Sequence, residues 1–274
     1  MTRLPQQGLE SAVIVVAHPD DELVWFASIL MRVKRVIVCF PEAPFLPALS
    51  EGRQKLLAEY PIKLEYLPLA ELESFDTADW TSPEETPDGL ALPGASAELQ
   101  RAYRTRVEPL ERELRQRLAG AANVFTHNPW GEYGHEGHVQ VHRVVARLAT
   151  EMGFRPWYGN YASNRTHVLT DRYLSGFGRE YYSEPIDARW AISMAGIYRR
   201  NGAWTWLDDY VWFAEECFVP GPLPASTRRG YGALYPLNML RLQRTGGGHA
   251  LAGNAHGKHR GSRLRRLWRR LRKG

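Results

Sequence analysis

Ala12-Val13-Ile14-Val15-Val16-Ala17-His18-Pro19-Asp20-Asp21-Glu22 is the stretch that decides the fold of this 274-residue chain. Its apolar, β-branched first half is typical of a strand buried on both faces, and Pro19 favours a turn into a helix. Open α/β sheets carry their chemistry at the carboxyl ends of their strands, which is where His18 and the acidic residues stand. One imidazole and two adjacent carboxylates can provide two ligands for zinc and leave one carboxylate to accept a proton from water.

Helix capping is the alternative interpretation of this motif. Acidic side chains in the first turn of a helix accept hydrogen bonds from free backbone amides and suit the helix dipole. Because caps are commoner than metal sites, the motif alone supports a function only weakly.

A second polar stretch, Asn128-Pro129-Trp130-Gly131-Glu132-Tyr133-Gly134-His135-Glu136-Gly137-His138, follows the strand-like run 123–126. It leads into an amphipathic run over 139–148, so strand, glycine-rich loop and helix occur in the same order as before. Both loops are therefore expected at one edge of the sheet, where His135 or His138 becomes a third ligand. His142 has the i, i+4 spacing of some paired zinc ligands, but without a His-Glu-x-x-His pattern it is expected to pack or to support a ligand.

Together the two motifs resemble the LmbE-like superfamily of metal-dependent de-N-acetylases, which includes N-acetylglucosaminyl-phosphatidylinositol de-N-acetylase (PIG-L). The resemblance rests on Ala17–Glu22 and Tyr133–His138, and it covers most of residues 11–150. It implies a Rossmann-like α/β three-layer sandwich with a mostly parallel sheet and a site at the carboxyl ends of the strands.

The resemblance also implies a role for each matched residue. Zinc, or another divalent transition metal, would have three ligands: His18, Asp21 and His138. Asp20 corresponds to the general base, His135 to a charged or acid group, and Tyr133 to a donor that stabilises the oxyanion.

Two positions depart from the pattern of the family. The second motif lacks the common His-Pro-Asp-His form and has Glu136 and Gly137 between its histidines. The family often carries Arg-x-x-Glu after its second strand, whereas here Arg53 is followed three positions later by Leu56.

The reaction implied is hydrolysis of the acetamide of an N-acetylglucosamine-type sugar on a glycolipid, lipid-linked saccharide or other glycoconjugate. Two alternatives stay open. One is an amidase that removes another acyl group from a glycoside conjugate, and the other is a non-catalytic, membrane-associated glycan-binding protein with a relic metal site. A two-metal phosphoesterase is less favoured, because it needs more carboxylates than these motifs offer.

Composition favours a cytoplasmic protein. The chain has only two cysteines, Cys39 and Cys217, so no disulfide framework is expected. Its N-terminus shows neither the basic start nor the apolar core of a signal peptide, and no apolar run approaches the ~20 residues that cross a bilayer.

Positive charge is concentrated at the C-terminal end. No Asp or Glu follows Glu216, while thirteen Lys or Arg residues do. The formal net charge of the whole chain is +5, so subtracting these thirteen positive charges leaves a net charge of −8 for residues 1–216. We expect a deacetylase domain over 1–245, a flexible Gly-rich linker over 246–257 and a basic amphipathic tail over 258–274.

The tail has the pattern of an interfacial helix. Four apolar residues recur at helical spacing: Leu264, Leu267, Trp268 and Leu271. Six cations fill the positions between and after them: Arg265, Arg266, Arg269, Arg270, Arg272 and Lys273. This arrangement favours an anionic membrane surface, and therefore a peripheral location at the inner face of the membrane. The alternatives are a disordered tail and an apolar stripe that docks on the protein itself or on a partner. A nucleic-acid partner is not expected, because a stripe of one tryptophan and three leucines suits lipid better than base stacking.

Periodicity predicts the remaining elements of the first half. Strands are expected over 35–40 and 62–67. Helices are expected over 23–31, 50–60 and 97–118. In the last of these four arginines are expected to be solvated, namely Arg101, Arg104, Arg106 and Arg112, and the alternative is that Arg104 or Arg106 reaches a phosphate on the substrate. The acidic segment 73–96, which is rich in Pro, Thr and Gly, is expected to form a long loop over the edge of the site.

Overall fold

The structure, a computed structural model, describes residues 2–177, 181–206, 210–225, 235–245 and 248–252. Its main sheet has seven strands. In spatial order these are β3 (Leu64–Tyr66), β2 (Arg35–Val38), β1 (Val13–Val16), β6 (Asn123–Thr126), β7 (Arg155–Gly159), β10 (Glu215–Pro220) and β9 (Tyr182–Pro185). The strands from β3 to β7 are parallel, whereas β10 is antiparallel to both β7 and β9. The sheet is therefore mostly parallel, as predicted.

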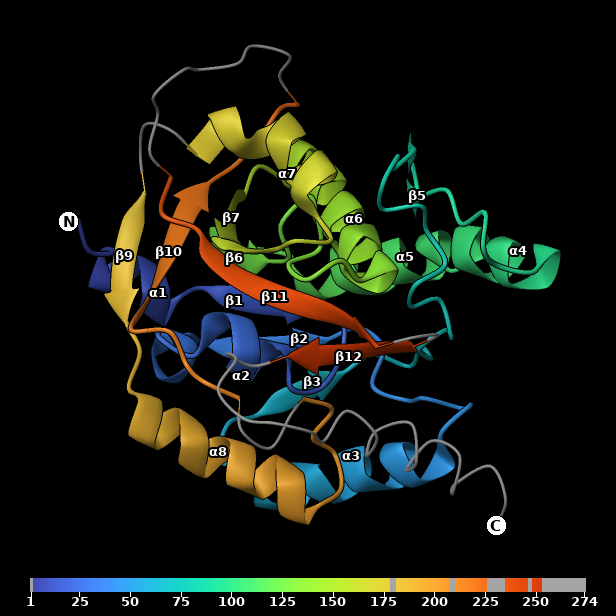
Figure 1. Ribbon diagram of the computed structural model, residues 1–274. Coiled ribbons are helices and arrows are strands. Elements are labelled where there is room, and N and C mark those ends of the chain that lie inside the picture. Colours follow the sequence, from blue (N-terminus) through green and yellow to red (C-terminus); the bar gives the residue numbers. More distant parts are fainter. Residues whose placement is uncertain (1, 178–180, 207–209, 226–234, 246–247, 253–274) are drawn as a thin grey trace.

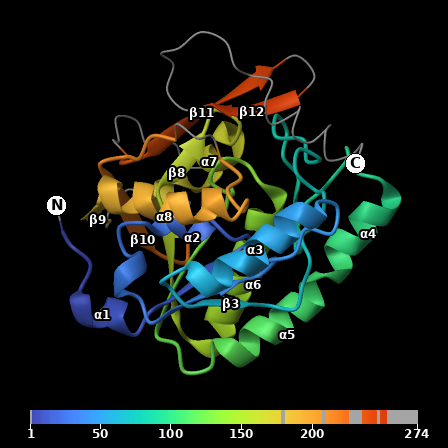
Figure 2. The same cartoon turned by 90° about the horizontal axis from the view of Figure 1, so that it is seen from below.

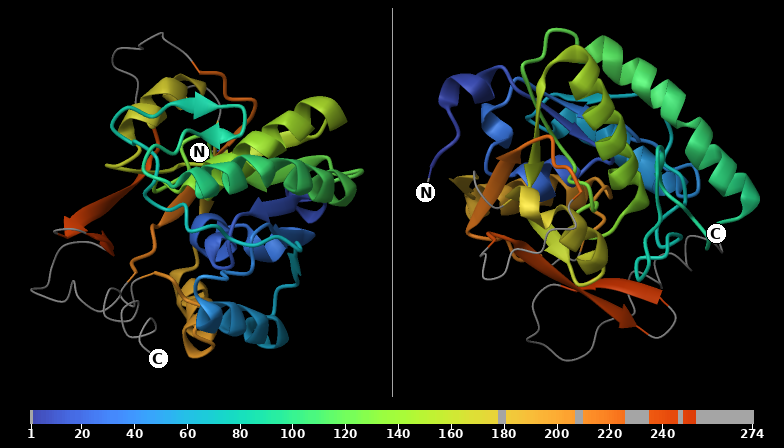
Figure 3. Two further views of the ribbon diagram at one scale, coloured as in Figure 1. Left: turned by 90° about the vertical axis from the view of Figure 1, so that its right-hand side faces the viewer. Right: turned by 90° about the horizontal axis from the view of Figure 1, so that it is seen from above.

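Helices cover both faces of the sheet (Figure 1). On one face lie α5 (Val107–Arg117) and α6 (Glu136–Met152), and on the other lie α2 (Asp21–Phe26), α3 (Pro47–Glu59) and α8 (Ala188–Arg200). The last two run side by side (Figure 2), and the left view of Figure 3 shows the blue strands between the green helices and the blue and orange ones. This arrangement is the three-layer α/β sandwich that the sequence predicts.

Strand β1 packs against the helix layers on both faces of the sheet. All four of its residues are at most 2% exposed. Val13 and Val15 pack with apolar residues of α5 and α6, while Ile14 and Val16 pack with those of α2 and α8, because successive side chains of a strand point to opposite faces. Full burial of such a side chain contributes about 1.5–3 kcal/mol, so a charge at any of these positions would be strongly destabilising.

The order of the strands reverses between β1 and β6. Strands β2 and β3 follow on one side of β1, whereas β7 follows on the far side of β6. In open α/β sheets such a reversal leaves a crevice at the carboxyl ends of the two strands. The two polar loops begin at these two strand ends, so the chain topology brings them together.

The remaining elements lie around this core. They are α1 (Gln6–Glu10), α4 (Ala97–Thr105), α7 (His167–Tyr173), two 3₁₀ turns (Leu30–Arg32 and Leu174–Phe177), the hairpin β4 (Glu85–Thr86) with β5 (Gly89–Leu90), and a small sheet of β8 (Tyr161–Ser163), β11 (Asn238–Thr245) and β12 (Gly248–Ala252). Within the segment expected as a linker, β12 pairs with β11. The rest of that segment and the predicted tail over 258–274 lie outside the described residues. No helix in the described part of the chain has the length and apolar character needed to span a membrane.

Of the predicted helices, one is shorter in the structure and one is divided. The helix expected over 23–31 ends at Phe26 and is followed by a 3₁₀ turn. The helix expected over 97–118 is divided at Arg106 into α4 and α5. Pro109 explains this break, because it lacks the N–H that would bond to the carbonyl of Thr105 and its ring would clash with that carbonyl.

Arg106 itself is buried, so the expectation of a solvated side chain was wrong. Its Nε and Nη2 donate to Oε1 of Gln140 at 2.9 and 2.7 Å, and its guanidinium lies 3.6 Å from the ring centroid of Phe40. These contacts connect α5 to α6 and to the end of β2.

Candidate metal centre

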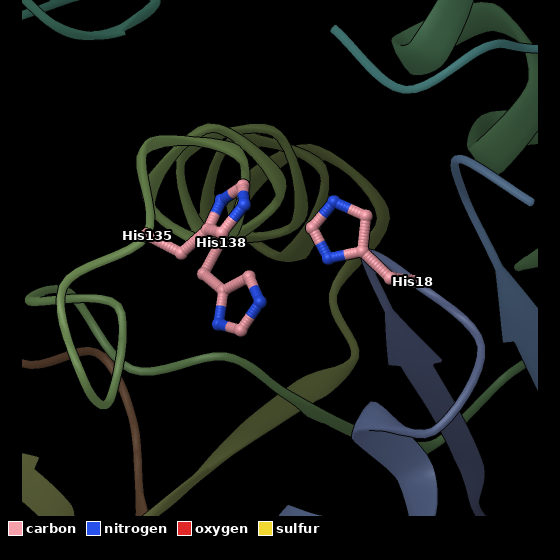
Figure 4. Close-up of side chains that lie close together, drawn as sticks. All are labelled: His18, His135 and His138. Carbon is pink, nitrogen blue, oxygen red and sulfur yellow. The ribbon is translucent and has the colours of Figure 1, made fainter. Parts of the chain in front are cut away.

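Buried histidines and an aspartate meet where the two loops leave the sheet. His18 follows β1, while His135 and His138 stand at the start of α6, and the three rings lie close together (Figure 4). Two sets of three residues have ligand atoms within 4.8 Å of one another, namely His18, His135 and His138, and Asp21, His127 and His138. All five are buried. The three ligands predicted from the sequence are divided between these sets, which share His138: His18 belongs to the first set and Asp21 to the second.

Asp21, from the first motif, contacts histidines of both motifs. Its Oδ2 accepts the backbone N–H of His18 at 2.7 Å and lies 3.3 Å from both His18 Nδ1 and His138 Nε2. Its Oδ1 accepts the indole N–H of Trp25 at 2.9 Å. Burial alone would raise the pKa of Asp21, but His138 and then His18 outweigh it and hold the pKa well below its usual range. Asp21 is therefore a carboxylate aimed at two imidazoles.

These residues fit a divalent metal ion. Among the described residues, the buried Nε2 atoms of His18 and His138 have no hydrogen-bond partner, a costly arrangement for polar atoms that water cannot reach. In a tetrahedral zinc site with bonds of about 2.0–2.1 Å, neighbouring ligand atoms are roughly 3.3 Å apart. The distance from Asp21 Oδ2 to His138 Nε2 has this value, whereas the equal distance to His18 is measured to its Nδ1 and not to the unpartnered Nε2. Two imidazoles and a carboxylate are also donors that zinc prefers, so the cluster supports Zn²⁺.

His127, which was not predicted, has no nitrogen left for a metal. Its Nε2 accepts the backbone N–H of Ala17 at 2.8 Å, so the ring proton is on Nδ1. That N–H faces Glu132 Oε2 at 2.9 Å, and His138 Nδ1 lies 2.8 Å from the same oxygen. His127 therefore contributes to the site through its hydrogen bonds to Ala17 and Glu132 and not as a metal ligand.

His138 is surrounded by negative charge. Burial lowers its pKa, but the carboxylates of Asp21 and Glu132 outweigh this and raise the pKa to about 10. Burial similarly opposes ionisation of Glu132, whose pKa is nevertheless held at about 2 by His127 and His138. Without a metal, His138 is thus an imidazolium between two carboxylates.

Zinc binding is therefore expected to release a proton from His138. Because the raised pKa keeps this ring protonated at neutral pH, the apparent zinc affinity should increase about tenfold per pH unit between pH 6 and 8. Calorimetric titration with zinc in buffers of different ionisation enthalpy measures the released protons directly. An affinity that stays constant over this range would contradict the assignment.

His135 occupies the N-cap of α6. Its Nδ1 accepts the backbone N–H of Gly137 at 3.0 Å, which leaves Nε2 to carry the proton of the neutral ring. Burial, together with the neighbouring His18 and His138, holds the pKa of His135 well below its usual range. In this arrangement His135 is a neutral N–H donor, whereas the resemblance implies a charged or acid group.

Asp20 adopts a left-handed backbone conformation, with φ of 96°. Its Oδ2 accepts hydrogen bonds from the backbone N–H of Thr205 at 3.1 Å and from its hydroxyl at 2.6 Å. Burial, and then the adjacent Asp21 carboxylate, raise the pKa of Asp20 well above its usual range. A carboxylate in this environment accepts a proton more readily than an ordinary aspartate does.

Tyr133 belongs to an aromatic cluster beside the histidines. Its ring centroid lies 5.3 Å from that of His138, 5.7 Å from that of Trp25 and 5.0 Å from that of Trp206. Phe75, from the predicted loop over the site, lies 5.8 Å from Tyr133. Burial and then the Asp21 carboxylate raise the pKa of Tyr133 well above its usual range, so its hydroxyl remains a donor at neutral pH.

The segment over 73–96 is attached to the site by Glu136. This buried carboxylate accepts backbone N–H groups from Thr77 at 3.0 Å and Ala78 at 2.9 Å, and the indole N–H of Trp80 at 3.1 Å. Glu136 stands where the second motif departs from the family pattern, so this departure has a structural role of its own.

Two further residues are placed by the structure. His142 bonds through Nδ1 to the carbonyl of His127 at 2.9 Å and belongs to neither ligand set, which agrees with a packing role. Arg53 is buried and donates to Glu71 Oε2 at 2.7 Å. Arg53 is thus paired with a carboxylate from another part of the chain, and Glu71 Oε1 lies 3.9 Å from His18 Nε2.

Comparisons with known proteins give structural neighbours only. No protein-family model and no curated protein matches the sequence. Among solved structures, the chain is similar to a deacetylase of the teicoplanin biosynthesis pathway in complex with teicoplanin, at 11% identity and a TM-score of 0.47, over 77% of this chain and 99% of that one. It is also similar to the zinc-inhibited form of teicoplanin deacetylase Orf2, at 12% identity and a TM-score of 0.47, over 76% of this chain and 97% of that one. Both likenesses are distant, so the chemistry has to be argued from the residues of this chain.

Proposed function

We propose that this chain is a zinc-dependent amide hydrolase that removes the acetyl group from an N-acetylglucosamine-type sugar. The observation that carries the proposal is the pair Asp20 and Asp21. One carboxylate faces two imidazoles in a metal-binding arrangement, and its neighbour has a raised pKa suited to accepting a proton. The ligands would be His18, Asp21 and His138, and the choice of sugar substrate rests on the resemblance of the two motifs.

The bound metal would supply a Lewis acid that acidifies water and polarises the acetyl carbonyl. Asp20 accepts the proton of the attacking water as the new carbon–oxygen bond forms. The hydroxyl of Tyr133 and the Nε2–H of His135 would donate to the developing oxyanion. When the carbon–nitrogen bond breaks, Asp20 returns the proton it took from the water to the sugar amine, and acetate leaves.

A panel of N-acyl sugars tests this reaction. Zinc-loaded protein is incubated with N-acetylglucosamine as the free sugar, on phosphatidylinositol, on a polyprenyl diphosphate and as a thioglycoside, and released acetate and free amine are quantified. Equal amounts of both products, absent after chelation of the metal, support the proposal. Release of a different acid from N-propionyl or longer analogues alone would instead establish an amidase. Saturable sugar binding without release would establish a binding protein.

A membrane surface would place the enzyme at lipid-linked substrates. The support is the sequence pattern of residues 258–274, whose cations are each worth about 1 kcal/mol near an anionic surface. Deleting residues 258–274 is expected to abolish sedimentation with vesicles containing phosphatidylserine while leaving zinc binding unchanged. Unchanged sedimentation of the truncated protein would contradict the membrane assignment.

A further inference from the structure

The loop between β6 and α6 holds a second carboxylate, Glu132, which contacts two histidines of the candidate metal centre, His127 and His138. Glu132 is 1% exposed and has a left-handed φ of 52°. Its Oε1 accepts the backbone N–H of Asn128 at 2.8 Å, and its own N–H donates to Asn128 Oδ1 at 3.0 Å. These two bonds orient the carboxylate so that Oε2 faces His127 and His138.

The positions of protons around Oε2 follow from its neighbours. An ionised carboxylate only accepts hydrogen bonds, so both histidines must present Nδ1–H to it. His127 can do so because its Nε2 already accepts the N–H of Ala17. His138 can do so in two forms: as the neutral ring with its proton on Nδ1 and none on Nε2, or as the imidazolium cation with a proton on each nitrogen. That Nε2 is buried, lies 3.3 Å from Asp21 and has no hydrogen-bond partner among the described residues.

We infer that Glu132 is a positioning residue that sets His138 in the tautomer that binds metal through Nε2. The same carboxylate, through His127 and the N–H of Ala17, connects the loop that carries His18 to the helix that carries His138. This inference rests on the proposed metal site. Carboxylates behind metal-binding histidines typically change metal affinity 10- to 100-fold when they are replaced.

Glu132→Gln is the most informative variant, because glutamine has the same shape as glutamate and only replaces one of the two carboxylate oxygens by an NH₂ group, which donates and cannot accept. With the amide nitrogen at the Oε2 position, both imidazole N–H groups lose their shared acceptor; with the amide nitrogen at the Oε1 position, the N–H of Asn128 loses its acceptor. In the first orientation Ala17 holds His127 in its tautomer, so His138 is the ring expected to change, and its Nε2 then carries the proton. Zinc affinity, measured by competition with a chromogenic chelator, should fall about 10- to 100-fold.

Glu216→Gln is the matched control. Glu216 is another fully buried carboxylate, and it accepts hydrogen bonds from Ser28, Ala27 and Tyr161, none of which is a candidate ligand. Zinc affinity of this variant should equal that of the wild type. An affinity of Glu132→Gln within twofold of the wild type, in a variant with native circular dichroism, would overturn the inference.

A measurement on the wild type keeps the inference testable if Glu132→Gln does not fold. Long-range ¹⁵N NMR of zinc-loaded protein should show His138 protonated at Nδ1 and bound through Nε2, and the opposite pattern would overturn the inference. Loss of zinc affinity in Glu132→Gln without any acetate release by the wild type would reject the proposed hydrolase and retain this role. Acetate release by the wild type, together with unchanged zinc affinity of Glu132→Gln, would support the proposed hydrolase and reject the positioning role of Glu132.

Discussion

Zinc binding is abolished and acetate release falls by about 10³-fold or more when His138 is replaced by Gln. The reason is that His138 faces Asp21 with a buried nitrogen that has no hydrogen-bond partner among the described residues, so its loss removes a ligand that no neighbour can replace. His127 cannot substitute for it, because its nitrogens already serve Ala17 and Glu132. Zinc content after dialysis, together with acetate release, measures both effects.

His142→Gln is the matched control for this prediction. His142 lies one turn further along α6, is also buried, and bonds to a backbone carbonyl. Its replacement should lower the melting temperature and leave one zinc bound. Equal zinc content in the two variants would show that the ligand set has been assigned wrongly.

Asp20→Asn is expected to retain zinc and lose about 10²- to 10⁴-fold in kcat, the range that general acid–base catalysis contributes. Asparagine tolerates the left-handed conformation of this position, and its side-chain oxygen can still accept the hydrogen bonds from Thr205. Only the ability to accept a proton is removed. Steady-state kinetics and bound zinc are measured on the same preparation.

Asp187→Asn provides the comparison. Asp187 is the N-cap of α8, as Asp20 is the N-cap of α2, and it accepts N–H groups from Arg189 and Trp190. Its replacement should leave kcat unchanged. Loss of zinc from Asp20→Asn would place Asp20 in the ligand set, and full activity of that variant would remove it from the mechanism.

The sequence was a good guide to features that depend on neighbouring residues. The buried run of β1 and the polar residues after it are local, so the strand, the turn and the candidate ligands His18 and Asp21 could be predicted together. His138 could be predicted because its loop repeats the same pattern. Pro109 also carried a readable signal for the break between α4 and α5, which the helical periodicity of the region concealed.

Features that depend on distant contacts could not be predicted. His127 follows β6 as His18 follows β1, but its bond to Ala17 exists only because the two strands pair across 110 positions. Arg106 is buried because Phe40 and Gln140 come from other elements. Glu132 looked like an ordinary loop residue, since nothing in its neighbourhood indicates that two histidines share its carboxylate.

The most direct test of the account is to titrate metal-free protein with zinc while measuring acetate release from an N-acetylglucosamine glycoside. We predict that release rises linearly with added zinc, stops rising at one zinc per chain, and is absent at every zinc level in Asp20→Asn. Acetate release that is independent of zinc, or that Asp20→Asn shares with the wild type, would contradict a metal-dependent hydrolase at this site.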